Sequence, residues 1–203
     1  SEGELALLHV TIRFPGRGRH EIDTSDENRI RIQALLAATS RNWTDRLSEA
    51  AAGDARVDAA LVQRYADAVP EAYKEDFPSE RALSDLVVLE GLRVGEIETR
   101  LCRSDGAAPG AWRFTLYVGD EPVTLGRVLP VLQSLGVQVI DERPYRVPRS
   151  DGIDCWIYDF GLGLPGDLAP DTLDSDPTLA GRFTDMFVVA WRGDSETDRF
   201  NEL

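Results

Sequence analysis

Two stretches of strict alternation, separated by one short amphipathic segment, constrain the fold of this chain most strongly. Large apolar side chains occupy every second position over 112–118 and again over 156–162. A period of two is typical of half-buried strands. Between them, apolar residues recur at helical spacing over 124–135, and a glycine then precedes a short apolar strand at 137–140. This order predicts an antiparallel sheet with helices packed on one face.

The remaining elements allow two overlapping interpretations. Strands are predicted at 8–14 and 97–101, and several helices between Thr24 and Leu92. If those helices form one enlarged crossover, the first six elements give β-α-β-β-α-β, the ferredoxin-like order. The alternative begins with strand 112–118 and continues as helix, strand 137–143, strand 155–162 and helix. Either way we predict an α+β, ferredoxin-like sheet with a helical insertion in its N-terminal half and a C-terminal helix.

Three local features sharpen this prediction. Pro130 lies inside the helix at 124–135 and removes one of its hydrogen bonds, so a kink is expected. The next strand is expected to end in the charged, proline-containing stretch 141–145. There the cluster Asp141-Glu142-Arg143 indicates either a solvated strand end with a local ion pair, or a contact to a neighbouring module or subunit. The last helix, 182–191, has an apolar side containing Phe183, Met186 and Phe187.

Composition excludes several classes of partner. The chain has 203 residues with a net charge of −14, whereas a nucleic-acid surface needs clustered Lys and Arg. Nucleic acid and anionic membrane are therefore poor partners, and no apolar run reaches the ~18 residues of a membrane span. The acidic start, residues 1–4, is unlike a secretion signal and suggests an internal piece of a longer chain. Cys102 and Cys155 are expected to be buried thiols of a cytosolic protein.

The motifs that suggest chemistry are weak. Residues 161–166 match G-x-G-x-x-G after a strand, but the following acids and prolines are unsuited to a phosphate-binding helix start. His9 and His20 are the two histidines and have no partners at metal-ligand spacing, so no metal site is predicted. Lys74, the single lysine, is expected to be an exposed residue in a local charge pair rather than a catalytic group.

Four longer segments resemble the large NAD-specific glutamate dehydrogenases of bacteria. They are "RYADAVPEAYKEDF" (64–77), "LGRVLPVLQSLGVQVIDERPYRV" (125–147), "WIYDFGL" (156–162) and "RFTDMFVVAWRGDSETDRFNEL" (182–203). In that family such segments lie upstream of the catalytic domain, in a regulatory region of ACT-type ferredoxin-like modules. The resemblance implies an ACT-like module with a helical insertion at 1–103 and a second at 104–170, the two allowed to share one continuous sheet. A linker and helix at 171–203 would lead toward the catalytic domain.

The same resemblance implies a function. The chain would be a cytoplasmic, non-catalytic regulatory and assembly region of an enzyme that deaminates L-glutamate oxidatively to 2-oxoglutarate and ammonia. We expect no cofactor in this region, NAD in the parent enzyme, and no catalytic residue here. Its expected partners are the catalytic domain of the same chain, further copies of itself and an amino-acid effector. The alternative is a structural oligomerisation module without a small-molecule ligand.

One turn is the candidate effector site. ACT modules commonly bind amino acids where the first strand turns into the first helix, which here is Gly119, Asp120, Glu121, Pro122 and Val123. Backbone N–H groups at a helix start suit a carboxylate, and Asp120 would meet an α-amino group. The family's Asp-x-x-Gly pattern is only partly present: Asp120 fits, but Pro122 and Val123 are followed by Thr124 rather than by a loop glycine. A plain turn is therefore the favoured alternative.

Overall fold

The computed structural model describes residues 25–31, 42–54, 57–103, 111–163 and 176–201. The chain divides into two compact units, Ser1–Arg41 and Asn42–Leu203. In the first unit the structure describes one short helical segment at 26–31, where Arg29 pairs with Asp26 at 3.1 Å. The predicted strand at 8–14 lies outside the described residues, and so do both histidines, His9 and His20.

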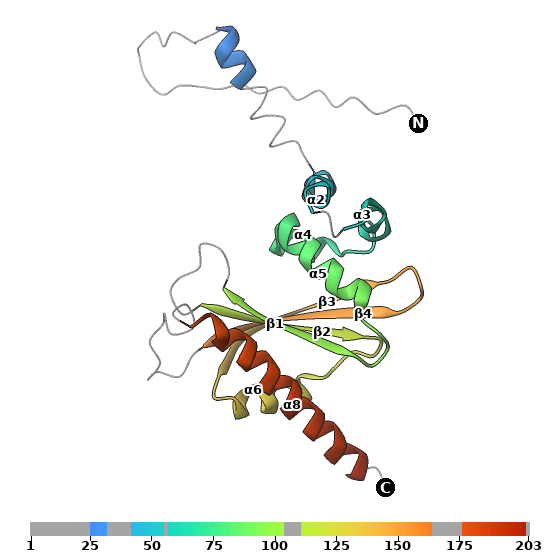
Figure 1. Cartoon of the computed structure of the whole chain (residues 1–203), viewed down its shortest axis with the longest axis vertical. Helices are drawn as coiled ribbons and strands as arrows, with labels where there is room; N and C mark the ends of the chain where they lie inside the picture. The colour runs from blue at the N-terminus through green and yellow to red at the C-terminus, as the bar shows by residue number, and fades with distance from the viewer. Residues whose placement is uncertain (1–24, 32–41, 55–56, 104–110, 164–175, 202–203) are drawn as a thin grey trace. The chain divides into compact units, whose positions relative to one another are not determined.

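The second unit combines a group of helices with a four-stranded sheet (Figure 1). Along the chain its elements are α2 (Trp43–Ala52), α3 (Ala59–Tyr65), α4 (Glu71–Asp76), α5 (Ser79–Gly91), β1 (Ile97–Arg103), β2 (Trp112–Gly119), α6 (Leu125–Ser134), β3 (Gln138–Pro148), β4 (Asp154–Gly163) and α8 (Pro177–Asn201). No helix in these described ranges has the length and hydropathy needed to cross a membrane.

The sheet is antiparallel throughout, with strand order β1-β2-β4-β3. The chain leaves β2, passes through α6, and returns as β3 on the far side of β4. Because β2 and β3 both run antiparallel to β4, they are parallel to each other, and β4 fills the space between them. This is a split β-α-β unit, the core of the ferredoxin-like arrangement. It matches the second predicted order, from strand 112–118 onward, with β1 added beside β2.

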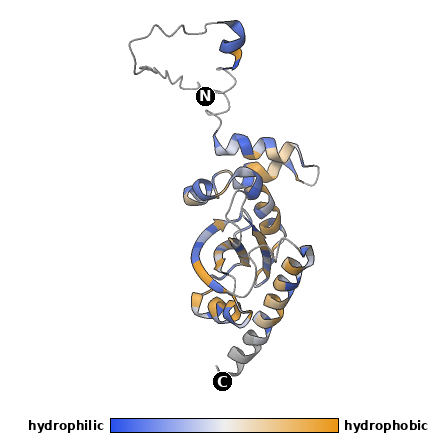
Figure 2. Cartoon of the chain, turned by 90° about the vertical axis from the view of Figure 1, so that its left-hand side faces the viewer, coloured by the Kyte–Doolittle hydropathy of each residue, from blue (hydrophilic) through white to orange (hydrophobic). Residues whose placement is uncertain are grey.

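One face of the sheet packs against α6 and α8 (Figure 1). The alternating residues predicted to face the core do so: Phe114 and Phe160 are fully buried, and Phe187 of α8 lies against Phe114 at 4.6 Å between ring centroids. Figure 2 shows hydrophobic and hydrophilic positions alternating along α8. The predicted apolar side of this helix is correct for Phe187 but wrong for Met186, which is 58% exposed. Trp191, one turn after Phe187, is the buried residue that completes the face.

Helices α2–α5 lie on the opposite side of the sheet, with α5 against β2 and α2 packed on α5 (Figure 1). The sheet therefore lies between two helical layers. Helix α5 supplies Leu86 and Leu89, and the sheet supplies Tyr117 and Ile157, all nearly inaccessible to solvent. Both faces of the central strands are therefore covered. This explains why β2 is almost continuously buried although its sequence alternates.

Several element boundaries differ from the sequence expectation. The last helix, expected at 182–191, spans Pro177–Asn201 as α8. Within the helical region expected between Thr24 and Leu92, helix α2 begins at Trp43, because Asn42 is extended and forms a capping box with Asp45. Strand β3 does not end at 141–145 but continues to Pro148. Pro144 is tolerated there because β3 is an edge strand, bonded on one side to β4 within the described sheet.

Strand β1 belongs to the same sheet as β2, with Leu101 opposite Phe114. The sequence placed 97–103 in a first module and left open whether the two modules share one sheet. Here the strands on either side of that boundary form one hairpin. Gly136, predicted to end the helix, has a φ of 82° and donates its N–H to the Gln133 carbonyl, which permits the abrupt turn from α6 toward β3.

Candidate functional site

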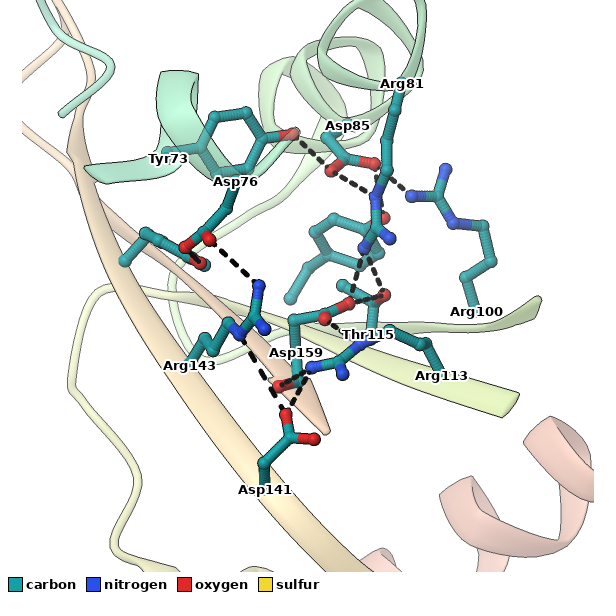
Figure 3. Close-up of polar contacts among 12 residues, drawn as sticks. Tyr73, Asp76, Arg81, Asp85, Arg100, Arg113, Thr115, Asp141, Arg143 and Asp159 are labelled. Carbon is teal, nitrogen blue, oxygen red and sulfur yellow. Dashed lines mark hydrogen bonds and ion pairs between the residues drawn. The ribbon is translucent and has the colours of Figure 1, made fainter. Parts of the chain in front are cut away.

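Charged side chains lie buried where helix α5 crosses the sheet (Figure 3). Asp159 of β4 is fully buried and accepts hydrogen bonds from two arginines. Arg81 of α5 donates to its Oδ1 at 2.5 Å, and the Nε of Arg113, on β2, donates to Oδ2. Thr115 of β2 also donates to Oδ1 at 3.1 Å. Asp159 thereby joins α5, β2 and β4 through one side chain.

A second buried carboxylate, Asp85, lies one helical turn beyond Arg81 on α5. Arg81 Nε lies 3.5 Å from its Oδ2, and Arg100 of β1 donates to Oδ1. Two phenols also donate to it, Tyr73 at 2.5 Å and Tyr117 at 2.8 Å. Asp85 thereby connects α4, α5, β1 and β2 through one side chain.

The network extends to the edge strand β3. Arg113 Nη2 donates to Asp141 at 2.8 Å, and Arg143 Nε lies 3.9 Å from the same carboxylate. Arg143 also donates to Asp76 of α4 at 2.9 Å, and the hydroxyl of Tyr145 donates to Asp76 at 2.5 Å. Asp141 and Arg143, the cluster noted in the sequence, thus contact β2 and the helical layer respectively. The expected local ion pair is present as well, between Arg143 and Asp141.

Together these residues form an unbroken series of alternating charges, drawn in Figure 3. From one sheet edge to the other, and back to the helices, it runs Arg100, Asp85, Arg81, Asp159, Arg113, Asp141, Arg143 and Asp76. Four positive and four negative groups make the series neutral. Each charge is thus offset by a neighbour. Asp85 and Asp159 are fully buried and need such partners to avoid a large loss of stability, whereas Asp76, Asp141 and Arg143 are exposed.

The local sequence explains how the network forms. Alternate positions of β2 are occupied by Arg113, Thr115 and Tyr117, so these three side chains face helices α2–α5. Their neighbours in the strand face α6 and α8. On β4, a β-carbon at Gly161 would meet Asp141 Oδ2 at 2.4 Å. A side chain at Gly161, the first glycine of the weak nucleotide-like motif, would therefore displace the Asp141 carboxylate from its place in the network. Residues 164–166 of that motif lie outside the described residues.

The environment of the network shifts the pKa values of its members. Burial lowers the pKa of Arg81, but the charges of Asp159 and Asp85 more than offset this, and the pKa lies above its usual value. Burial, followed by Asp85, raises the pKa of both Tyr73 and Tyr117. Arg81 therefore stays charged, and the two phenols stay protonated donors.

The predicted effector turn lies apart from this network, between β2 and α6. Several of its backbone groups are already hydrogen-bonded: Asp120 N–H donates to the Asp154 carbonyl at 2.7 Å, and Val123 N–H donates to the Tyr158 hydroxyl at 3.0 Å. The indole of Trp156 donates to the Asp120 carbonyl at 3.2 Å. Asp120 has a φ of 85°, the single described non-glycine residue with positive φ. Glu121 and Pro122 are exposed, and Gly119 is buried against the Arg93 carbonyl.

Lys74 forms the predicted local pair, with Glu71 at 2.7 Å, but its side chain is only 14% exposed. It lies over the Trp43 ring, 5.6 Å from the centroid. Both residues line a shallow depression with Arg46 and the start of α5. The cysteines are free thiols; Cys155 is buried as predicted, whereas Cys102 is only half-buried. Among the described residues no group of His, Cys, Asp and Glu could hold a metal ion.

The central pair of this network has a weak signal in the sequence. Asp159 stands inside the strand "WIYDFGL", whose other residues are apolar, glycine or aromatic, and a charge there indicates a buried partner. The partner Arg81 lies 78 positions earlier. Sequence reasoning missed it because the second helical layer was not expected.

The split β-α-β sheet, with α6 and α8 on one face, defines an ACT-type α+β domain, here joined by charged contacts to a helical layer. Two family models match the chain, one over the helical layer and the other over the sheet. "Glutamate dehydrogenase, helical motif 2" matches residues 47–92, and "Glutamate dehydrogenase, ACT3 domain" matches residues 96–176. The network lies where these two matched segments meet.

Three relatives, each called "NAD-specific glutamate dehydrogenase", match the whole chain. Identity is 38% over 214 residues with the Mycobacterium tuberculosis protein, 32% over 209 with that of Halomonas elongata, and 30% over 210 with that of Pseudomonas aeruginosa. The chain spans only 12–13% of the length of these relatives. It belongs to the family of large NAD-specific glutamate dehydrogenases, of which it carries helical motif 2 and the ACT3 domain.

Proposed function

We propose that this chain is a non-catalytic regulatory and assembly region of an NAD-dependent glutamate dehydrogenase. The parent reaction is the oxidative deamination of L-glutamate to 2-oxoglutarate and ammonia, with NAD as the acceptor of the hydride. The region works in the cytoplasm, contacts the catalytic domain of the same chain and contributes to a homo-oligomer. It binds no cofactor of its own.

The observation that carries this proposal is the alternating network between the two matched domains. Each of its eight charges is paired with another side chain of the protein. A catalytic site needs groups poised toward a substrate, whereas this arrangement directs its charged groups toward each other. Such pairing supports a region whose task is to hold helices and sheet in a fixed relation.

The direct test is an assay of the purified chain with glutamate and NAD. No glutamate-dependent reduction of NAD is expected, and Lys74→Ala is expected to leave that result unchanged. Turnover that survives purification and disappears in Lys74→Ala would overturn the non-catalytic assignment. Light scattering over a range of protein concentrations tests assembly, because a homo-oligomer gives a mass above that of one chain.

The finer proposal is an amino-acid effector at Gly119, Asp120, Glu121, Pro122 and Val123. In its support, α6 starts after Thr124 without a side-chain cap, and the Asp120 side chain is exposed. Asp120 would bind the α-amino group, and the start of α6 the carboxylate. Calorimetric titration with each standard amino acid should then give binding that Asp120→Asn weakens and Asp151→Asn, in the exposed hairpin, does not.

The alternative is a structural module without a ligand. It is favoured by the internal hydrogen bonds of the same turn, which already use the N–H groups of Gly119, Asp120 and Val123. If calorimetric titration gives no heat of binding for any standard amino acid, and the amino acids leave the oligomeric mass unchanged, this alternative is selected over the effector.

A further inference from the structure

The sheet divides the hydrophobic interior of this unit into two separate cores. The core under α6 and α8 contains Phe114, Leu116, Phe160 and Phe187, and no residue of α2–α5. The other core belongs mostly to α2–α5. From the sheet it includes five residues: Tyr117, Tyr145, Val147, Cys155 and Ile157. The core under α6 and α8 contains no residue of these helices, so separation of α2–α5 from the sheet would leave that core in place.

The contact between α5 and the sheet is charged at its centre. Asp85 and Asp159 are both fully buried, and Arg81 contacts both. A buried charge is tolerated only while its partner is present, so loss of one carboxylate penalises the docked state far more than the undocked state, where water solvates the arginines. Apolar contacts lack this dependence on a single group.

Helix α5 is also held at its other end. Arg149, in the β3–β4 hairpin, donates from Nη1 to the carbonyls of Leu89 and Leu92, at 2.8 and 2.5 Å. Both carbonyls lie at the C-terminal end of α5, where the Leu89 carbonyl also accepts the Leu92 N–H at 3.3 Å. Other helices of this layer are attached to α5. Helix α2 packs against it, and Tyr73 of α4 donates a hydrogen bond to Asp85 of α5.

We propose that the pairs formed by Arg81 and Arg100 with Asp85 and Asp159 act as an electrostatic latch that docks helices α2–α5 onto the sheet as one unit. When the latch loses a charge, these helices open together, while the sheet remains folded on α6 and α8. The latch is a conformational device placed between helical motif 2 and the ACT3 domain. A role of this latch in regulation rests on the proposed function. In that role, a change at the sheet would reach the helical motif through α5.

Hydrogen exchange followed by mass spectrometry on the whole chain tests the latch. In Asp85→Asn we expect amides of α2–α5 to exchange about a hundredfold faster, the scale set by an unpaired buried charge. Amides of β2, β4, α6 and the part of α8 up to Trp191 should change by less than about threefold. Asp154→Asn, which removes the exposed partner of Arg146, is the matched control and should change neither group.

Two further variants separate the latch from a general loss of folding. Tyr73→Phe removes one hydrogen bond to Asp85 with little change of shape, and should accelerate exchange in the same helices by about tenfold. Asp85→Asn combined with Arg100→Gln restores the charge balance, so it should exchange more slowly than Asp85→Asn alone. A role of Asp85 in shape alone predicts no such rescue.

Two results would overturn the latch: uniform acceleration across both cores in Tyr73→Phe, or unchanged exchange of α2–α5 in Asp85→Asn. Both are independent of any dehydrogenase assay. A failed latch therefore leaves the regulatory assignment standing, and turnover by this chain would leave the latch standing.

Discussion

Arg81 and Asp159 are 78 positions apart in the chain, yet the guanidinium of one lies 2.5 Å from the carboxylate of the other. Both side chains are largely inaccessible to solvent, and the Arg81 guanidinium also stacks on the Phe77 ring, 4.1 Å from its centroid. This single contact joins the helical motif to the central strand of the ACT-type sheet. Its loss therefore affects how the two parts hold together.

The first prediction concerns the energy of this pair. Arg81→Met or Asp159→Asn should each lower the free energy of unfolding by about 3 kcal/mol, because each removes one of the two charged partners of a buried group. The double variant should lose less than the sum of the single losses, since neither charge is then left alone. Denaturant unfolding followed by circular dichroism measures all three, and strict additivity would contradict direct coupling between the two groups.

The second prediction concerns alkaline pH. The chain has five tyrosines, and burial raises the pKa of every one of them above the ordinary value near 10. Above about pH 10 the unfolded chain releases phenolic protons that the folded chain keeps. Stability is therefore complete below pH 10 and falls as pH rises, by about 1.4 kcal/mol per pH unit for each such tyrosine.

Ultraviolet absorbance of tyrosinate, recorded beside circular dichroism during an alkaline titration, measures this effect. The two signals should change together, because the phenols ionise only on unfolding. Tyr73→Phe and Tyr117→Phe should each reduce the steepness of the loss. Ionisation of most tyrosines in a chain that is still folded would show that the phenols are not held by their partners.

The third prediction uses two glycines with opposite surroundings. Gly161→Ala should lower the stability, because the new methyl group would lie 2.4 Å from an Asp141 oxygen, and Asp141→Ala in the same chain should recover part of the loss. Gly126, in helix α6, has nothing within 4 Å of the corresponding position. Gly126→Ala should therefore raise stability by about 0.5–1 kcal/mol. Thermal unfolding of the three variants decides between these outcomes.

The fourth prediction concerns the attachment of α8. Phe187 is fully buried against Phe114, whereas Met186 beside it is largely exposed. Phe187→Ala should cost about 3–5 kcal/mol, and Met186→Ala should stay within about 0.5 kcal/mol of the parent. Denaturant midpoints give both values. Equal effects would mean that α8 is not a layer of the folded core.

The period of the sequence determined the elements around α6 and which of their faces is apolar. Residues 112–118 and 156–162 are strands because their side chains alternate, and Gly136 permits the turn between α6 and β3 because it has no β-carbon. These signals are local, so they act before any tertiary contact forms. The four quoted segments likewise sufficed to indicate the family.

Tertiary structure alone decided what covers the second face of the sheet. Thr115 and Tyr117 occupy alternate positions of β2 that the sequence pattern alone assigned to solvent, yet both are buried under α5. Strand β3 continues through Pro144 because its outer edge needs no further hydrogen bonds in the described sheet. The pairing of Arg81 with Asp159 depends on folding a helix back across strands that come later in the chain. No local pattern encodes such a contact, since the energy that selects it arises only when both charges leave water together.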